Sequence, residues 1–328
     1  MNQDPSQLID QHGRRKRKLR ISLTDRCNFR CSYCMPDHPQ WLPKKQLLSF
    51  EEIVRVARLM IGQGISHIRL TGGEPLLRRD LVSCVAALHA LRSEGLEQLS
   101  MTSNASLLAP QAQALKAAGL DDLNISLDSI QPETFKRMTG RELAPVLQGI
   151  EAARAAGLGV KINSVLLRKD NADQILPLIH WARGEGLELR FIEYMPLDMP
   201  GRWQRAQVVS EDEIIAAVAA QHRVEALPRS HDPATRYRID GEYELGVIST
   251  VSKPFCASCD RLRLTATGEL YTCLFAQSGT PLRELLRADA GDAQLLEIIR
   301  TAVWHKDVGY AARQGPVERP VTMHMLGG

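Results

Sequence analysis

The sequence lacks an excess of either charge: its 328 residues carry a formal net charge of only +3. So small an excess gives no global field that would favour nucleic acid as a partner. Basic residues gather only in the run RRKRKLR at residues 14–20, and such a run is most often a solvated tail. We therefore expect a basic flexible tail over residues 1–17 and no nucleic-acid partner.

Long hydrophobic runs are also missing. No apolar stretch approaches the roughly 20 residues that span a bilayer, and residues 1–10 have no signal-peptide core. We expect a cytoplasmic protein with no membrane partner. In that reducing compartment the seven cysteines are expected to be thiols or metal ligands rather than disulfides.

Short β-rich runs alternate with helical patterns between residues 18 and 220, which predicts a parallel sheet with helical crossovers. Six strand–helix units fit this span, whereas a complete eight-unit barrel needs about 250 residues. We therefore predict an α/β fold, a partial (βα)6 TIM-like barrel. A doubly wound sheet is the alternative, but no G-x-G-x-x-G follows the first strand. The expected strands are residues 19–24, 67–71, 98–102, 123–127, 160–167 and 189–194.

The composition changes near residue 230, where the chain becomes turn-rich with short β runs. We expect the barrel at residues 18–229 and a smaller C-terminal region at residues 230–328. Unusual residues gather where the expected barrel strands end, and in parallel barrels these ends form the face that holds the active site. The clusters are TGGEP (71–75), TSNAS (102–106), SLDS (126–129) and EYMP (193–196).

Two groups of three cysteines carry the chemistry. Cys27, Cys31 and Cys34 have no histidine nearby at finger spacing, so they make an incomplete set for structural zinc, which takes four ligands. Three thiolates would leave one iron of a [4Fe–4S] cluster open to another ligand, which favours iron–sulfur for this group. The second group fits a cluster or a zinc ribbon lacking one ligand about equally well; it consists of Cys256, Cys259 and Cys273.

The motif C-x-x-x-C-x-Y-C, followed by GGEP at residues 72–75, resembles the signature of radical S-adenosylmethionine (SAM) enzymes. From about residue 19 to residue 328 the chain resembles, more narrowly, the GTP 3',8-cyclase family of molybdenum cofactor biosynthesis. Five segments carry this likeness in order and spacing: SLTDRCNFRCSYCMP, RLTGGEPLLRRDL, FIEYMPLD, PFCASCDRLRLTATGELYTCLF and MLGG.

The resemblance implies a lyase with two [4Fe–4S] clusters and SAM as cofactors. SAM bound to the first cluster would give a radical that abstracts the ribose 3' hydrogen of GTP, after which the sugar attacks C8 of guanine. The implied product is (8S)-3',8-cyclo-7,8-dihydroguanosine 5'-triphosphate. The resemblance also implies an electron donor, a downstream cyclic pyranopterin monophosphate synthase and, as one option, a homodimer.

Site residues follow from the resemblance, position by position. Independently of it, Arg261 and Arg263 alternate on one strand, where two guanidinium groups would suit a polyphosphate, and Arg20 and Arg69 lie on strands where an unpaired charge would be costly. The implied SAM contacts are Tyr33, Gly73, Glu74, Ser126 and Met195, and the implied GTP contacts are Arg20, Arg69, Thr102, Lys161, Arg261 and Arg263. The tail glycines Gly327 and Gly328 are implied to insert into the cavity.

Three positions depart from the family pattern. His67 stands where lysine is common, Ala105 where glycine is favoured, and Tyr310 where histidine is common. These departures affect details of substrate contacts and leave the reaction class unchanged.

Two other hypotheses remain. One is a different radical SAM enzyme that modifies peptides, which would be expected to have more auxiliary cysteines. The other is a zinc-stabilised module that binds RNA through its basic run.

Metal content separates the last hypothesis from the other two. We expect anaerobically prepared protein to hold about eight irons per chain, four for each cluster, and to be brown. Metal analysis that finds stoichiometric zinc instead would contradict both iron–sulfur hypotheses.

Overall fold

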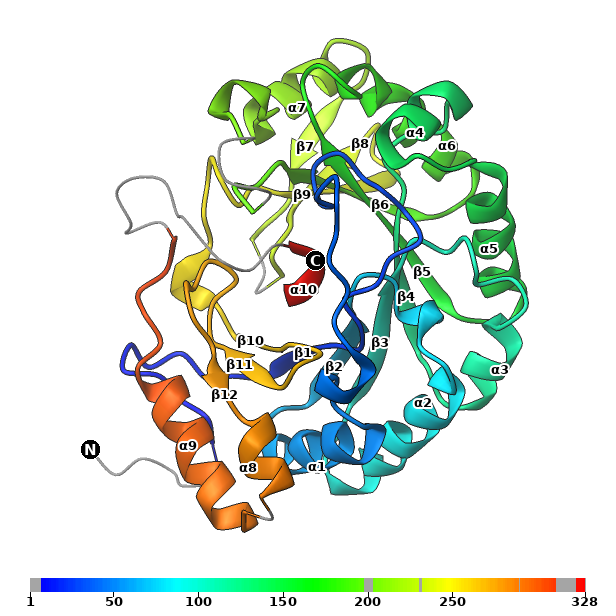
Figure 1. Cartoon of the computed structure of the whole chain (residues 1–328). Coiled ribbons are helices and arrows are strands. Elements are labelled where there is room, and N and C mark those ends of the chain that lie inside the picture. The colour runs from blue at the N-terminus through cyan, green and yellow to red at the C-terminus, as the bar shows by residue number, and fades with distance from the viewer. Residues whose placement is uncertain (1–6, 198–202, 230–231, 289, 311–322, 328) are drawn as a thin grey trace.

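The computed structural model describes residues 7–197, 203–229, 232–288, 290–310 and 323–327. These residues form a single twisted sheet with helices on its outer side, which curls around a central space (Figure 1). Along the sheet the strands follow the order β12-β11-β10-β1-β2-β3-β4-β5-β6-β9-β8-β7. The described strands at the two ends of this order do not pair with each other, so the barrel is open, as the count of strand–helix units predicted.

The eight strands from β10 through β9 in that order pair in parallel with one another. The four remaining pairings, two at each end of the sheet, are antiparallel. The barrel strands are β1 (Lys18–Ser22), β2 (His67–Thr71), β3 (Gln98–Ser103), β4 (Asp122–Ser126), β5 (Gly159–Leu166) and β6 (Glu188–Glu193). The added strands are β7 (Val224–Ala226), β8 (Thr235–Ile239), β9 (Tyr243–Ile248), β10 (Arg261–Leu264), β11 (Glu269–Tyr271) and β12 (Thr280–Pro281).

The six expected barrel strands are therefore confirmed to within one or two residues. The sheet also continues past residue 230, because β9 pairs with β6 and β10 pairs with β1, both in parallel. The sequence did not predict this continuation. The expected division of the chain at residues 229–230 stays a prediction, since the sheet crosses it without a break.

Helices cover the outer face of the sheet, and their apolar sides form one core with it (Figure 1). The first of them begins at a capping box, in which Ser49 and Glu52 each accept from the other's backbone N–H, as the sequence predicted. These outer helices are α1 (Phe50–Ile61), α2 (Leu81–His89), α3 (Ala112–Ala117), α4 (Pro132–Thr139), α5 (Ala144–Ala155), α6 (Ile175–Gly184), α7 (Glu211–Ala219), α8 (Arg283–Arg287) and α9 (Asp292–Trp304). The short helix α10 (Met323–Leu326) lies instead in the central space (Figure 1). None of the described helices is both long and apolar enough to cross a membrane.

The expectation of a solvated basic tail is wrong for residues 7–17. Arg14 and Lys16 are buried, whereas Arg15 and Arg17 between and beside them are exposed. Both buried cations contact the carboxylate of Asp10 at 2.7 Å. The alternation is that of an extended chain, whose successive side chains point to opposite sides, so half of the basic run faces the protein.

Ala105 shows why its position favours glycine. Its φ is +59°, in the left-handed region that costs a residue with a Cβ about 1–2 kcal/mol. It is fully buried, and its carbonyl oxygen lies against Gly149 of α5, where an added Cβ would overlap that oxygen. A glycine on the helix therefore makes room for the loop that follows β3.

We predict that Gly149→Ala destabilises the protein by about 1–3 kcal/mol, because the added methyl group overlaps a buried backbone oxygen. The control is Gly184→Ala, at the end of α6, where a Cβ meets nothing within 4 Å. There the better helix propensity of alanine should add up to about 1 kcal/mol. Urea unfolding measures both values, and equal shifts in the two variants would contradict the overlap.

Candidate active site

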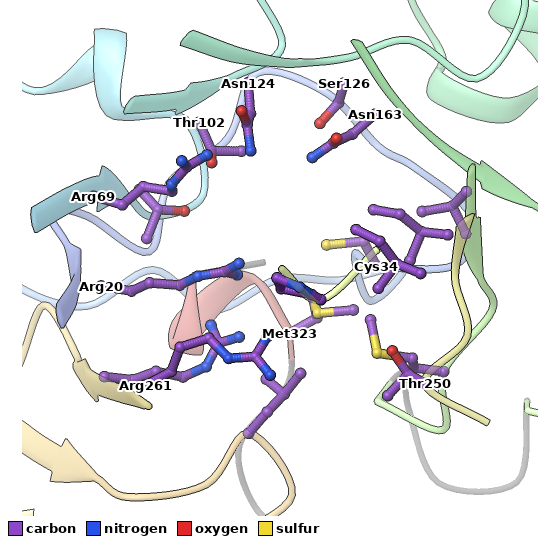
Figure 2. Close-up of a pocket in the computed structure, with 18 of the residues that line it drawn as sticks. Arg20, Cys34, Arg69, Thr102, Asn124, Ser126, Asn163, Thr250, Arg261 and Met323 are labelled. Carbon is purple, nitrogen blue, oxygen red and sulfur yellow. The ribbon is translucent and has the colours of Figure 1, made fainter. Parts of the chain in front are cut away.

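The parallel strands surround a cavity of about 670 Å³, a size suited to a small-molecule ligand (Figure 2). Its lining comes from the interior of the barrel, from the loops after the strands and from the C-terminal segment. All six cysteines of the two groups line it, and so does every other expected site residue apart from the two tail glycines. The structure thus gathers in one space residues that lie more than 200 positions apart in the sequence.

The first cysteine group lies in the loop between β1 and α1. The Sγ atom of Cys27 accepts from the backbone N–H of Phe29 at 3.4 Å and from Nδ2 of Asn104 at 3.9 Å. Burial raises the pKa of Cys27 to about 11 and that of Cys34 to about 12, and neighbouring thiols add to the effect at Cys34. Thiols are held as thiolates here only if a positive group such as iron offsets the burial.

The second cysteine group has a different electrostatic setting. Burial acts to raise the pKa of Cys259, but Arg261, Lys306 and Lys16 lower it to about 6. Cys273 accepts from the backbone N–H of Phe275 at 3.4 Å. The lowered pKa of Cys259 favours its thiolate, the form that binds metals.

The donor set fits iron–sulfur clusters. Within the described ranges, no three His, Cys, Asp or Glu side chains lie close enough to share one metal ion. A [4Fe–4S] cluster does not require its ligands to lie that close together, because each thiolate binds its own iron. Two groups of three partly buried thiols, all facing one cavity, meet that demand.

The GGEP loop lies directly against the loop of the first cysteines. Gly73 N–H donates to the carbonyl of Thr24 at 2.8 Å, and Glu74 N–H donates to the carbonyl of Arg26 at 2.7 Å. A Cβ on Gly73 would overlap the Arg26 carbonyl. Only a glycine permits this approach, which brings the expected SAM loop beside the expected cluster loop.

Glu74 binds other parts of the chain. Its carboxylate accepts from Leu76 N–H at 3.1 Å, the Ser103 hydroxyl at 2.8 Å and Asn104 N–H at 2.7 Å. Burial raises the pKa of Glu74 to about 7 in spite of these donors. The side chain therefore ties the GGEP loop to the loop after β3, and its expected contact with SAM stays a prediction.

Tyr33 is oriented by a residue that the sequence did not single out. Its hydroxyl donates to Oδ2 of Asp128 at 2.7 Å, and Oδ1 of Asp128 accepts from Val165 N–H at 2.8 Å. Burial raises the pKa of Asp128 to about 6. The SLDS loop that contains Asp128 was expected at this face, but nothing in its spacing distinguished the aspartate from its neighbours.

Two asparagines were also missed. Asn124 on β4 and Asn163 on β5 line the cavity beside Ser126, and each has a buried Oδ1 atom without a hydrogen-bond partner (Figure 2). A buried acceptor left unpaired costs about 1–3 kcal/mol, which a donor on a ligand would offset. Polar residues on strands that point into a barrel are the sequence signal that could have found them.

Positive charge dominates another part of the cavity, where Arg20, Arg69 and Arg261 point inward (Figure 2). Burial, and then repulsion from Arg263, Arg69 and Arg261, holds the pKa of Arg20 well below its ordinary value. Within the described ranges no carboxylate pairs with Arg20. Nη2 of Arg69 lies 3.9 Å from Asp122, but its Nη1 is buried without a hydrogen-bond partner. A group of buried arginines of this kind is energetically costly unless an anion binds among them.

The remaining expected contacts lie on the same lining. Lys161 is half-buried, with its Nζ 3.8 Å from Glu188. Thr102, next to the end of β3, and Ser126, at the end of β4, line the cavity. Met195 packs beside Met323 of the C-terminal segment.

Arg263 binds the C-terminal segment. Its Nη1 donates to the carbonyl of Leu326 at 3.2 Å and to that of Gly327. Gly327 has φ +72°, and an added Cβ would overlap Thr71. The tail therefore reaches the end of β2, whereas Gly328 lies outside the described residues.

Two of the three departures from the family pattern have local partners. His67 lines the cavity, and its Nδ1 lies 2.8 Å from the hydroxyl of Ser66. The ring of Tyr310 stacks on Phe275 with centroids 4.2 Å apart.

Comparison with known proteins agrees with this geometry. Residues 21–182 match the profile of the Radical SAM superfamily, and residues 187–312 match that of Molybdenum Cofactor Synthesis C. The chain is 47% identical to a GTP 3',8-cyclase of Streptomyces coelicolor, over 92% of this chain and 90% of the relative. It is 41% identical to a GTP 3',8-cyclase of Rhodopirellula baltica, over 99% of this chain and 93% of the relative. The chain belongs to the GTP 3',8-cyclase family.

Solved structures agree on the fold. Streptococcus suis SuiB matches with a TM-score of 0.60 over 88% of this chain and 69% of that chain, at 14% identity. SuiB bound to the precursor peptide SuiA matches with a TM-score of 0.62. Membership of the GTP 3',8-cyclase family confirms the expected resemblance, and the Radical SAM match confirms SAM and [4Fe–4S] as cofactors. Which residues bind them stays a prediction.

We predict that Gly73→Ala weakens SAM binding at least tenfold, because the methyl group forces the GGEP loop away from the cysteine loop. Gly62→Ala, where a Cβ meets nothing closer than 3.6 Å, is the control and should bind SAM normally. Equilibrium dialysis with reconstituted protein measures the affinity. Wild-type affinity in Gly73→Ala would show that the approach of the two loops is not needed.

Proposed function

We propose that this protein converts GTP to (8S)-3',8-cyclo-7,8-dihydroguanosine 5'-triphosphate, acting as a lyase at the first step of molybdenum cofactor biosynthesis. The observation that carries the proposal is the pairing, in one cavity, of two cysteine groups with buried arginines that have an excess of positive charge. A nucleoside triphosphate offers the anion that those arginines require. The names of the relatives agree with this substrate.

On the SAM side, Cys27, Cys31 and Cys34 would hold the first cluster. When bound, this cluster and SAM supply the electron and the carbon radical that begin the reaction. Around them the chain supplies binding and orientation: Gly73 allows the two loops to meet, and Asp128 fixes the ring of Tyr33. The proposed SAM contacts are Tyr33, Gly73, Glu74, Ser126 and Met195.

On the GTP side, Cys256, Cys259 and Cys273 would hold the second cluster. The forked donors of Arg20, Arg69 and Arg261 bind the phosphate oxygens, and Lys161 adds a point charge. Arg263 has two possible partners, the tail and the nucleotide, and its contact with the carbonyls of residues 326 and 327 favours a role in closing the cavity. A closed cavity excludes water from a reactive radical. Thr102 completes the proposed GTP contacts.

The wider assignments follow from the same proposal. Residues 18–229 would bind SAM, and residues 230–328 would carry the second cluster and the tail. The reaction takes place in the cytoplasm, draws on an electron donor, and passes its product to a cyclic pyranopterin monophosphate synthase. A homodimer is the proposed assembly.

Anaerobic incubation of the reduced protein with SAM and GTP tests the reaction. We expect a cyclised nucleotide of the same mass as GTP and SAM cleavage that rises when GTP is added. The control replaces GTP by a peptide substrate mixture. SAM cleavage that is indifferent to GTP, with no cyclised nucleotide, would show that the assignment is wrong.

We predict opposite effects of Arg20→Met on binding and stability. The variant loses the proposed charge-assisted hydrogen bond from Arg20 to a phosphate of GTP, worth about 1.5–3 kcal/mol. This loss should weaken GTP binding roughly 10- to 100-fold. Loss of a buried charge with no carboxylate partner in the described residues should raise the free energy of unfolding without GTP. Calorimetry and urea unfolding measure the two effects. Arg58→Met, which removes an exposed arginine beside Glu94, is the control.

If Arg20→Met lowers both the affinity for GTP and the free energy of unfolding, Arg20 supports the fold instead. The parallel variants Arg261→Ala and Arg263→Ala should weaken GTP binding while both clusters still assemble. Loss of iron from them would mean that these arginines are structural.

A further inference from the structure

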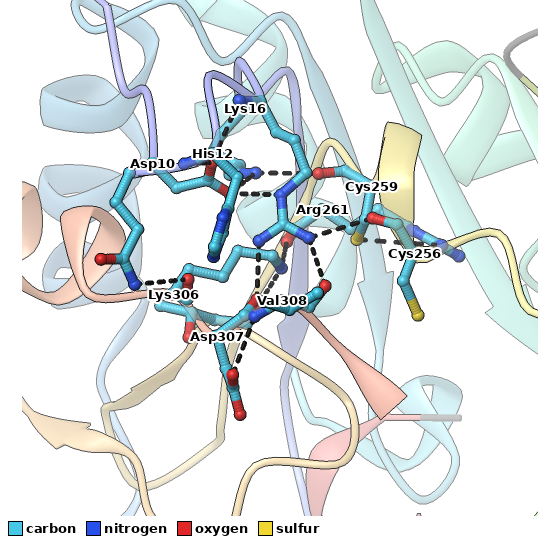
Figure 3. Close-up of polar contacts among 12 residues, drawn as sticks. Asp10, His12, Lys16, Cys256, Cys259, Arg261, Lys306, Asp307 and Val308 are labelled. Atoms are coloured by element: carbon cyan, nitrogen blue, oxygen red, sulfur yellow. Dashed lines mark hydrogen bonds and ion pairs between the residues drawn. The ribbon is translucent and has the colours of Figure 1, made fainter. Parts of the chain in front are cut away.

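Residues 10–16 lie directly behind the loop of the second cysteine group (Figure 3). Arg17 and Lys18 donate their backbone N–H groups to the carbonyl of Asp260, which fixes the segment next to that loop. Gln11 N–H donates to the carbonyl of Trp304 at 3.1 Å, which fixes it to the end of α9. The segment is therefore held between two parts of the C-terminal region.

Three cations from behind the loop hold the backbone at the three cysteines, one at each. Nη1 of Arg14 donates to the carbonyl of Cys256 at 3.0 Å, and Nζ of Lys16 donates to the carbonyl of Cys259 at 2.8 Å. Nζ of Lys306 donates to the carbonyl of Thr272, the residue before Cys273.

The lysines are buried to an unusual degree. Lys16 is 1% exposed and Lys306 is 2% exposed, although lysine is rarely fully buried without a paired carboxylate. Nζ of Lys16 lies 2.7 Å from Oδ2 of Asp10. Nζ of Lys306 contacts only carbonyl oxygens among the described residues, the second being that of Arg261 at 3.3 Å.

The charges behind the loop do not balance. Arg14 and Lys16 share the single carboxylate of Asp10, and Lys306 adds a third cation with no carboxylate of its own in the described part of the chain. An excess of buried positive charge is costly unless negative charge lies nearby. The cysteine loop supplies it, because a cluster ligated by thiolates is anionic and becomes more so on reduction.

We propose that Arg14, Lys16 and Lys306 are positioning residues for the second cluster, which hold the backbone at its three cysteines and raise its reduction potential. The inference rests on the proposed function, in which the second triad binds a [4Fe–4S] cluster. Charge and hydrogen bonds around a cluster are among the features that set its potential. The basic run of the sequence thereby gains a role at the metal centre.

Lys306→Met in the full-length, reconstituted protein is the main test. The potential of each cluster is measured by a redox titration followed by electron paramagnetic resonance. A full-length variant with alanine at Cys27, Cys31 and Cys34 identifies the signal of the second cluster. We expect the equilibrium constant for reduction of the second cluster to fall at least tenfold, or about 59 mV for one electron, while the first cluster is unchanged.

Two controls separate charge from packing. Arg15→Met removes an exposed cation from the same segment and should change neither potential. Lys306→Arg keeps the charge and should retain a potential closer to that of the wild type than Lys306→Met does. If Lys306→Met loses iron, the comparison is made with Lys16→Gln, for which a fall in the second potential is again expected.

An unchanged second potential in a variant that keeps both clusters would overturn the inference, as would equal behaviour of Lys306→Met and Lys306→Arg. Variants that all lose the second cluster, Lys306→Arg included, would also overturn it, because the lysine would then serve only the fold. The proposed function is tested separately, by measurements on the wild type that come before those on the variants. Zinc or no metal on the second triad of the wild type would contradict it, whereas a wild type with both clusters and GTP cyclisation would leave it intact.

Discussion

Positive charge buried without an equal amount of negative charge governs this structure. Arg20 and Arg69 point into the barrel from neighbouring strands, held side by side by the parallel register of β1 and β2. Arg263 lies beside Arg20 on β10, which pairs with the other edge of β1, and Arg261 lies two residues before it on the same strand. Burial, and then repulsion from the other arginines, lowers the pKa of Arg20, so the empty cavity is unfavourable and the filled one is not. Stability is given up at the site to gain affinity for an anion.

The same imbalance recurs behind the second cysteine group, where the described chain offers one carboxylate to Arg14 and Lys16 and none to Lys306. Around the first cysteine group the setting is reversed. Burial raises the pKa of Cys27, and the nearby carboxylates of Glu74 and Asp128 bind neutral donors from the chain. The two cysteine groups therefore differ in electrostatic setting although both offer three thiols. Such a difference is a means of giving two clusters of one type different potentials.

The barrel and its strands could be predicted from the sequence because the alternation of β-rich and helical runs is a local signal. The cysteine groups could be predicted for the same reason, since their spacing is short and specific. The pairing of β10 with β1 could not, because it joins residues about 240 positions apart and depends on the whole sheet. The burial of Arg14 and Lys16 was missed because their partner Asp10 and their acceptor loop are recognisable only in the folded chain. Asp128, Asn124 and Asn163 are common residue types whose role comes from what they face.

The most direct measurement of the central claim compares the affinities of GTP and guanosine for the reconstituted protein under anaerobic conditions. If the unbalanced arginines exist to hold a triphosphate, GTP binds at least 100-fold more tightly, and the difference shrinks as salt is added. Equal affinities for the two ligands, independent of salt, would contradict the account.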